Sequence, residues 1–198
     1  MTIESHPLEP FLPQDATILF LGSFPPPRAR WSMDFFYPNF NNDFWRVMGL
    51  VHFGDAQHFV APGGRKFNYD AVVAFCRQAG LAFYDTASKV RRLKDNASDA
   101  FLEILEPTDV GALLARLPRC RTIVTTGGKS SEELLRSLTT ASHSPVILSA
   151  AKDLPAPGTC VDITAWGRDL RWWRTPSTSR AYPLSLASKA AAYSLLWK

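Results

Sequence analysis

Aromatic and amide side chains crowd into one stretch of the sequence, between Leu19 and Arg46. An apolar segment ends there at Gly22–Ser23, and three prolines and two arginines follow. Seven aromatic residues then alternate with three asparagines and two aspartates. So much flat apolar surface beside so many amide groups is not typical of a protein core, because buried amides need partners. The composition indicates a binding segment placed directly after a strand.

Three further segments carry polar side chains at the expected ends of strands: "DTASKVRR" (85–92), "TTGGKS" (125–130) and "TPSTSR" (175–180). The "GGKSS" run is not a P-loop, because Ile123 stands where that motif needs its first glycine. No G-x-G-x-x-G or G-x-S-x-G motif occurs, and the four histidines have no metal-ligand spacing. We therefore expect no dinucleotide, no metal, no other cofactor and no Ser-His-Asp triad.

Bulk properties narrow the class of protein. The chain has 198 residues, 46% hydrophobic content and a net charge of +4, which suit one globular domain with a mild basic excess. The three cysteines lie too far apart for a zinc or iron–sulfur site. No secretory signal and no apolar run of membrane-spanning length, roughly 20 residues, is visible. These features predict a monomeric cytoplasmic protein with no membrane partner.

Strands and helices alternate along the chain. Apolar runs predict strands at 16–23, 81–86 and 121–128, with a short last strand inside 171–180. Helical spacing and caps predict helices at 40–53, 69–80, 106–120, 129–138 and 183–197, the third capped by Thr108. This alternation predicts a single three-layer α/β domain over 1–198 around a central, mostly parallel four-stranded sheet. Residues 1–15 are left as an N-terminal extension and 139–167 as an irregular region.

The predicted sheet brings the polar segments together. In open α/β sheets, ligands bind at the carboxyl ends of the strands. The segments that follow Phe20, Tyr84, Val124 and Trp173 should therefore meet at one edge of the sheet.

Five segments, in this order, resemble the uracil-DNA glycosylase superfamily, most closely its mismatch-specific and hypoxanthine-type branches. They are "GSFPP", "FYPNFNNDFWRVMG", "GLAFYDTASKVRRL", "CRTIVTTGGKSSEEL" and "TPSTSRAYPLSLASKAAAY". The resemblance covers most of 18–193 but not 139–167. It implies a glycosylase-like fold, no cofactor and no iron–sulfur cluster. It also implies base-excision repair, in which a damaged or mismatched base in DNA, here a deaminated one such as uracil or hypoxanthine, is flipped out and released by hydrolysis.

The resemblance assigns base recognition to the first two loops and to the second strand. Tyr37 matches the stacking aromatic of the family, with Phe40 as its substitute, and Ser23 and Phe24 lie in the first loop. Asp85 stands where uracil-specific members carry a base-reading Asn. An ionised Asp only accepts hydrogen bonds, so it suits a base edge with N–H groups. Capping of the next turn, or pairing with Arg91 or Arg92, is an equally open role for Asp85.

Catalytic roles are less direct, because Phe24 stands where most members carry a water-activating Asp or Asn. In the hypoxanthine-type branch an Asn of the aromatic segment is implicated, which corresponds to Asn42; Asp34 and Asp43 are alternatives. Asn42 could equally be a helix N-cap. Thr175 matches the residue that contacts the leaving base.

DNA contacts are expected from the last loop and from basic side chains. Ser177 and Thr178 would hold phosphates, Ser179 takes the place of the family's wedge residue, and Arg180 or Tyr182 would fill the vacated stack. Further phosphate contacts are predicted, against the alternative of a solvated face, for the basic residues Arg28, Arg30, Arg91, Arg92 and Lys94.

Two other functions stay open on the sequence alone. Phe24 in the first loop is compatible with a non-catalytic nucleic-acid or nucleotide binder that keeps the glycosylase fold. The third possibility is hydrolysis of a free nucleoside or nucleotide.

Overall fold

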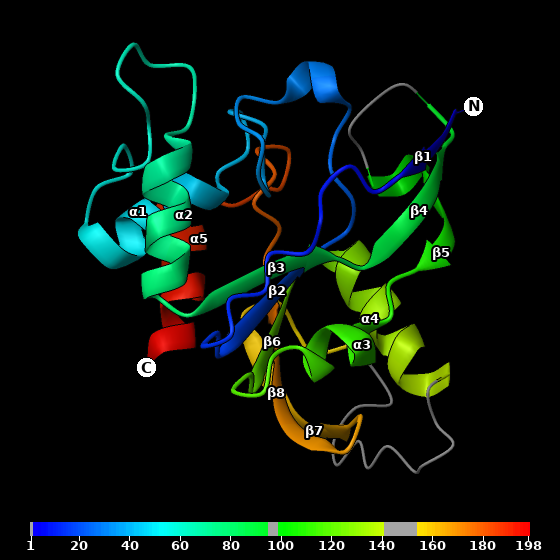
Figure 1. Ribbon diagram of the computed structural model, residues 1–198. Coiled ribbons are helices and arrows are strands. Elements are labelled where there is room, and N and C mark those ends of the chain that lie inside the picture. The colour runs from blue at the N-terminus through cyan, green and yellow to red at the C-terminus, as the bar shows by residue number, and fades with distance from the viewer. Residues whose placement is uncertain (1, 95–98, 141–153) are drawn as a thin grey trace.

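The computed structural model describes residues 2–94, 99–140 and 154–198. Two β-sheets organise these residues (Figure 1). The larger sheet has five strands in the order β3-β2-β6-β8-β7. Its strands are β2 (Ile18–Gly22), β3 (Leu81–Asp85), β6 (Thr122–Thr126), β7 (Thr159–Ala165) and β8 (Arg168–Thr175).

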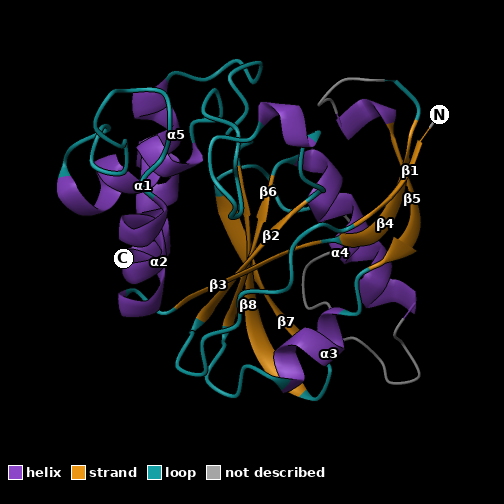
Figure 2. Ribbon diagram, turned by 45° about the horizontal axis from the view of Figure 1, so that its top comes forward, coloured by secondary structure: helices purple, strands orange, loops and turns teal. Residues whose placement is uncertain are grey.

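Helices cover both faces of the larger sheet, as Figures 1 and 2 show. Alternate side chains of β2 belong to two separate cores: Phe20 packs with α1, α2 and α5, and Leu19 packs with α3 and α4. Every residue of β2 is buried, which explains its continuous apolar run. The helices are α1 (Phe44–Phe53), α2 (Tyr69–Gln78), α3 (Val110–Ala115), α4 (Gly128–Thr140) and α5 (Leu186–Ser194), with short 3-10 turns at Arg28–Arg30, Asp99–Phe101 and Leu195–Trp197.

The central sheet differs from the four-stranded prediction by one strand. Four strands are parallel as expected, and β7 adds an antiparallel edge strand that pairs with β8. The turn between them holds Trp166 and Gly167 at positive φ, 51° and 71°. β7 lies inside the region that was expected to be irregular. It was not predicted because an edge strand with exposed polar residues gives no continuous apolar signal. Residues 139 and 140 belong to α4, 154–158 are irregular as expected, and 141–153 lie outside the described residues.

A second, three-stranded antiparallel sheet was not predicted. It has the order β1-β4-β5 and consists of β1 (Thr2–Ser5), β4 (Ala87–Arg92) and β5 (Leu102–Pro107). The residues expected to be an N-terminal extension thus supply a strand, and "DTASKVRR" is mostly strand rather than loop. Cross-strand ion pairs such as Arg91–Glu103 explain the charged sequence of β4.

Helix α3 starts later than predicted. Asp109, not Thr108, is its N-cap, and the Asp109 carboxylate accepts the amide hydrogen of Ala112 at 2.9 Å. The hydroxyl of Thr108 instead donates to the backbone carbonyl of Asp85 at 2.7 Å. That hydrogen bond fixes the end of β3 against the start of the second sheet.

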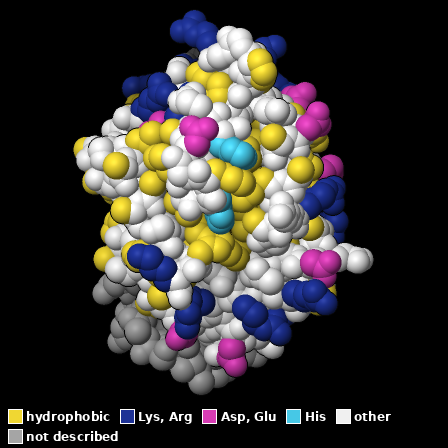
Figure 3. Space-filling view, turned by 90° about the vertical axis from the view of Figure 1, so that its left-hand side faces the viewer, with side chains coloured by type: hydrophobic (Ala, Val, Ile, Leu, Met, Phe, Trp, Pro, Cys, Tyr) yellow, Lys and Arg dark blue, Asp and Glu magenta, His cyan; other side chains and the backbone are white. Residues whose placement is uncertain are grey.

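The side of the molecule that carries α1 and α2 exposes hydrophobic side chains together with histidines (Figure 3). Phe53 and Tyr69 are each about half exposed there, and the ring of His58 stacks on Phe53 with centroids 3.7 Å apart. None of the helices in the described part of the chain is long and apolar enough to cross a membrane.

Candidate functional site

A pocket of about 700 Å³ lies at the carboxyl ends of the parallel strands. Gly22 of β2, Asp85 of β3 and Thr126 of β6 form part of its wall, and the loop after β8 closes it with Ser177. This volume falls within the range of about 300–1,000 Å³ that is usual for small-molecule sites. The strand ends therefore meet at one site, as the topology predicted.

Tyr37 presents an aromatic wall to this pocket. Its ring lies parallel to that of Phe44, with centroids 3.8 Å apart, and its hydroxyl is 2.8 Å from that of Thr126. Burial raises the pKa of Tyr37 well above its ordinary value, so the phenol stays neutral. Its backbone has φ 52°, a left-handed conformation that is rare for a non-glycine residue. The surroundings thus hold Tyr37 in a strained and fixed position.

Asp85 is buried, with 7% of its surface exposed, and it lines the pocket. Its Oδ2 atom lies 3.0 Å from Nε2 of His6. Its Oδ1 atom lies over Gly22, so closely that a Cβ atom at position 22 would collide with it. The pairing with Arg91 or Arg92 that the sequence left open does not occur, because those arginines bind Glu103 and Glu4. Sequence reasoning missed His6 entirely.

A second carboxyl group, on Asp99, lines the same pocket and was also missed. The hydroxyl of Ser23 donates to Asp99 Oδ1 at 2.7 Å. Burial is the main cause that raises the pKa of Asp99 above its ordinary value, and the hydrogen bond from Ser23 partly opposes this shift. Asp99 therefore ionises less readily than an exposed aspartate.

Asn42 lines the pocket and also helps to start α1. Its Oδ1 atom accepts the amide hydrogen of Phe44 at 2.9 Å, which fixes the orientation of the side-chain amide. The N-cap residue of α1 is Asp43 and not Asn42, so the capping alternative for Asn42 is wrong, although its side chain binds the first amide of the helix from the preceding position.

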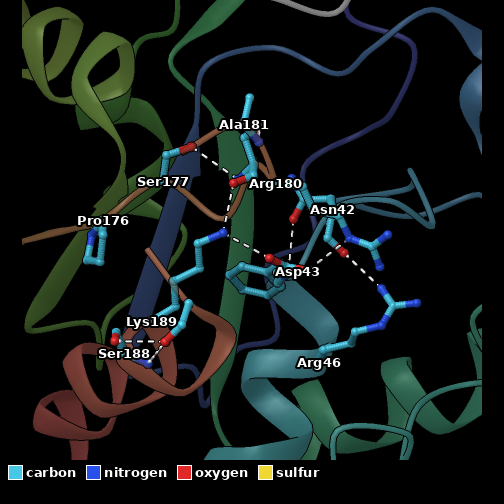
Figure 4. Close-up of polar contacts among 12 residues, drawn as sticks. Asn42, Asp43, Arg46, Pro176, Ser177, Arg180, Ala181, Ser188 and Lys189 are labelled. Carbon is cyan, nitrogen blue, oxygen red and sulfur yellow. Dashed lines mark hydrogen bonds and ion pairs between the residues drawn. The ribbon is translucent and has the colours of Figure 1, made fainter. Parts of the chain in front are cut away.

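Asp43, an alternative catalytic residue on the sequence, is instead part of a buried ion-pair cluster (Figure 4). Lys189 of α5 donates to its Oδ2 atom at 2.8 Å, and Arg180 donates to its Oδ1 atom at 3.2 Å. Lys189, only 1% exposed, also donates to the carbonyl of Ser179 at 2.8 Å. The amide of Asp43 donates to the carbonyl of Thr178 at 2.9 Å. This cluster ties the loop after β8 to the starts of two helices.

Phe24 forms part of the pocket wall and does not fill the pocket. Its side chain is 8% exposed and packs with Ala87, Val90 and Leu102 of the second sheet. The ring meets that of His6 edge-on, with centroids 5.3 Å apart.

Most of the predicted site residues meet at this pocket. Those that line it are Ser23, Phe24, Tyr37, Asn42, Asp85, Ser177, Thr178, Ser179, Arg180 and Tyr182. Arg30 lines it as well. Those that lie away from it are Asp34, Phe40, Thr175, Arg28, Arg91 and Arg92.

The residues that lie away from the pocket have other partners. Thr175 is fully buried and donates its hydroxyl to the carbonyl of Thr125 at 3.1 Å. Phe40 packs on Phe67, and the guanidinium of Arg46 lies 4.3 Å from its ring centre. Exposed Asp34 pairs with Arg28.

The two arginines of β4 both form ion pairs, but they differ in burial. Arg92 is 4% exposed, pairs with Glu4 and donates to the carbonyl of Pro25, so it is a structural residue. Arg91 is partly exposed and pairs with Glu103 at 2.8 Å across the second sheet. The charge run of β4 therefore mainly joins strands.

The fold is similar to a known one. The solution NMR structure described as a "putative Uracil DNA glycosylase from Methanosarcina acetivorans" matches with a TM-score of 0.60 and 20% sequence identity, over 100% of both chains. This likeness establishes that the chain has the same mixed α/β fold as that structure. No family model and no curated protein matches the sequence.

Proposed function

We propose that this protein is a DNA glycosylase that hydrolyses the N-glycosidic bond of a deaminated base, uracil or hypoxanthine, in DNA. One observation carries the proposal: Tyr37, Asn42, Asp85 and the 177–182 loop surround a single pocket at the strand ends. The fold of the chain is that of a solved structure described as a putative uracil DNA glycosylase. Residues from distant segments meeting in this way are what a site for a flipped-out base requires.

In this proposal Tyr37 stacks on the base. One face of its ring is covered by Phe44, and Tyr37 lines the pocket, where the opposite face would receive a planar ligand. Stacking of a base on an aromatic ring contributes about 1–3 kcal/mol. The hydrogen bond to Thr126 holds the ring in place.

Asp85 reads the edge of the base. Its Oδ1 atom accepts a hydrogen bond from a ring N–H group, which uracil offers at N3 and hypoxanthine at N1. A base that presents a carbonyl oxygen or an unprotonated ring nitrogen at that point is repelled by the carboxylate.

Asn42 positions the attacking water. Its Oδ1 atom keeps one lone pair after accepting from Phe44, and a water hydrogen can bind there. The water oxygen then bonds to C1′ as the C1′–N bond breaks, and the released base takes up a proton. Because the sugar is cation-like in the transition state, orientation and electrostatics matter more here than a strong base.

The DNA strand is held by the 177–182 loop and by Arg30. Arg30 is exposed at the pocket, and within the described residues it forms no ion pair, so its guanidinium is available to a phosphate. The hydroxyls of Ser177 and Ser179 accept amide hydrogens within the loop, so their own hydrogens are available to the same DNA backbone.

The test is a base-release assay on otherwise identical oligonucleotides that contain uracil, hypoxanthine or a G·T mismatch. We expect release of uracil or hypoxanthine, and strong loss of release in Asn42→Ala with the fold retained by circular dichroism. Gln78→Ala, which removes an exposed amide at the end of α2 and away from the pocket, is the matched control. Absence of release from all three oligonucleotides by folded protein would refute the enzymatic proposal.

The placement of Phe24 favours a second candidate, a non-catalytic binder of damaged DNA. Its apolar ring occupies the first loop, where the resemblance expects a water-activating residue. Tight binding to abasic or mismatched duplex without release would support this candidate. Release from free deoxynucleosides, with little dependence on salt, would instead identify a nucleoside hydrolase.

A further inference from the structure

His6 lies directly behind the carboxylate of Asp85. Its Nε2 atom is 3.0 Å from Asp85 Oδ2, and its side chain is only 2% exposed. His6 does not line the pocket, so it reaches the site only through Asp85. Since 79 residues separate the two side chains, the contact depends on tertiary structure alone.

The second sheet holds His6 in this place. β1 pairs with β4, the strand that begins two residues after Asp85, and the amide of His6 donates to the carbonyl of Ser88 at 2.8 Å. The imidazole packs against the rings of Phe24 and Tyr84, with centroids 5.3 and 4.6 Å away. The first strand of the chain therefore delivers one polar group to the far side of the pocket wall.

The contacts of the imidazole, with the acceptor oxygen of Asp85 opposite Nε2, favour the ring forms that carry a hydrogen on Nε2. Nδ1 lies 3.2 Å from the amide nitrogen of Leu8 and 2.8 Å from its carbonyl oxygen. A neutral ring with hydrogen on Nε2 accepts the Leu8 amide at Nδ1, and a charged ring donates from Nδ1 to the Leu8 carbonyl. Both forms donate from Nε2 to Asp85. The remaining tautomer would turn a lone pair toward the carboxylate.

This hydrogen bond makes the two oxygens of Asp85 unequal. His6 uses one lone pair of Oδ2 and fixes the orientation of the carboxylate, whereas no donor among the described residues contacts Oδ1, which lies over Gly22 at the pocket. A carboxylate with two free oxygens can accept two adjacent N–H groups, as it does from arginine. Guanine presents such a pair at N1 and its 2-amino group, whereas hypoxanthine and uracil present a single ring N–H.

We propose that His6 is a positioning residue that sets base specificity: by binding Oδ2 of Asp85 and holding the carboxylate with Oδ1 at the pocket, it makes the pocket select a base with one ring N–H and gives the paired N–H edge of guanine no advantage. This inference rests on the proposed function and names its substrate class more closely. His6 thereby separates hypoxanthine, the deaminated base, from an undamaged purine that differs from it by one amino group.

The first measurement requires no turnover. Nitrogen-15 NMR of the full-length protein reports the protonation of each ring nitrogen of His6, and Asp85→Asn serves to assign the contact. We expect hydrogen on Nε2 near neutral pH and a change in the Nε2 resonance in Asp85→Asn. An Nε2 atom without hydrogen would overturn the inference.

The second measurement compares hypoxanthine with guanine at the same position of one duplex. His6→Leu removes the donor, and His6→Gln keeps an N–H near the position of Nε2. His58→Leu removes a histidine that does not line the pocket. We expect the preference for hypoxanthine, as a ratio of kcat/KM, to fall about tenfold or more in His6→Leu and to stay within about threefold in the other two. In the Asp85→Asn background, His6→Leu should change the ratio by less than about threefold.

Equal effects of His6→Leu in both backgrounds would overturn the inference, because His6 would then act on the fold and not through Asp85. If wild-type protein releases no base, the proposed function fails by itself. The same comparison is then made on dissociation constants, with duplexes that carry 2′-fluorinated, slowly hydrolysed nucleotides. A hypoxanthine preference unaffected by His6→Leu, or no binding to either duplex, would overturn the inference there.

Discussion

Two aspartates of this protein have the same burial and a basic partner, yet they differ in what they can do. Asp43 and Asp85 are each 7% exposed. Both oxygens of Asp43 are occupied, one by Lys189 and one by Arg180. Asp85 gives one oxygen to His6 and keeps the other at the pocket. Burial and a hydrogen bond from a basic side chain are therefore common to both, and the oxygen without a protein donor distinguishes a residue that can bind a ligand from one that stabilises the fold.

The largest expected effect on stability concerns the ion-pair cluster around Asp43. Lys189→Met should lower the free energy of unfolding by about 3–5 kcal/mol, because it leaves a buried carboxylate without its main partner. Lys89→Met is the matched control: it breaks the more exposed Lys89–Glu106 pair and should cost about 0–1 kcal/mol. Urea denaturation measures both values. Similar losses in the two variants would contradict a structural role for the Asp43 cluster.

Asp85→Asn should show the opposite balance between function and stability. We expect kcat/KM for base release to fall about 10- to 100-fold, because a charge-assisted hydrogen bond to the base is worth roughly 1.5–3 kcal/mol. The circular dichroism spectrum should stay native. Asp43→Asn, measured in parallel, should lower the free energy of unfolding more than Asp85→Asn does. A reversal of these two results would remove the distinction between the aspartates.

Substitutions of Tyr37 test whether the ring that lies beside Asp85 in the pocket contributes to binding by stacking. Tyr37→Leu should weaken binding of a damaged duplex by about 1–3 kcal/mol, which is the usual worth of base stacking. Tyr37→Phe keeps the ring, loses the hydrogen bond to Thr126 and should cost only about 0.5–1.5 kcal/mol. Fluorescence anisotropy reports both affinities. Equal losses would show that the hydroxyl, not the ring face, matters.

Salt dependence separates arginines that are free from those already paired. Arg30→Gln should reduce the slope of log K against log salt concentration by about 0.9, which corresponds to one phosphate contact. Arg92→Gln removes a buried arginine that is bound to Glu4, so among molecules that remain folded the slope should not change. Titrations at several salt concentrations, after removal of aggregated protein, provide the comparison. An unchanged slope in Arg30→Gln would place the phosphates elsewhere.

The smallest effect is expected from Asp99. Because burial raises the pKa of Asp99, folding favours its protonated form. The stability from this preference is fully present below the ordinary value near 3.8 and is lost as pH rises through the raised pKa. Asp99→Asn stays neutral and should gain stability relative to wild type across that interval. Denaturation curves that shift equally at all pH values would contradict this expectation.

The sequence predicted the parts of the site that continuous segments encode. The apolar runs of β2, β3 and β6 marked strands that are buried on both faces, and parallel strands bring their carboxyl ends together. Tyr37, Asn42 and Asp85 follow from that arrangement and from the resemblance. Edge strands such as β1 and β7 were missed, because short, half-exposed strands carry little apolar pattern.

The partners of the polar groups could not be predicted in the same way. His6 meets Asp85 across 79 residues, Lys189 meets Asp43 across 146, and Ser23 meets Asp99 across 76. A single buried lysine or histidine has no periodicity, so nothing in the local sequence separates it from an exposed one. Arg92 illustrates the same difficulty: its charge run predicted a phosphate contact, with a solvated face as the alternative, and the side chain is instead buried.

The hydrogen bond from Lys189 to Ser179 affects the rate and the affinity with which the proposed DNA strand would bind. The carbonyl of Ser179 and the start of α1 are fixed to the same ammonium group, so the loop that faces the ligand is already assembled in the free protein. A preorganised loop spares the ordering entropy that a mobile one loses on association. In the proposed function, this loop therefore does not have to become ordered when a DNA strand binds.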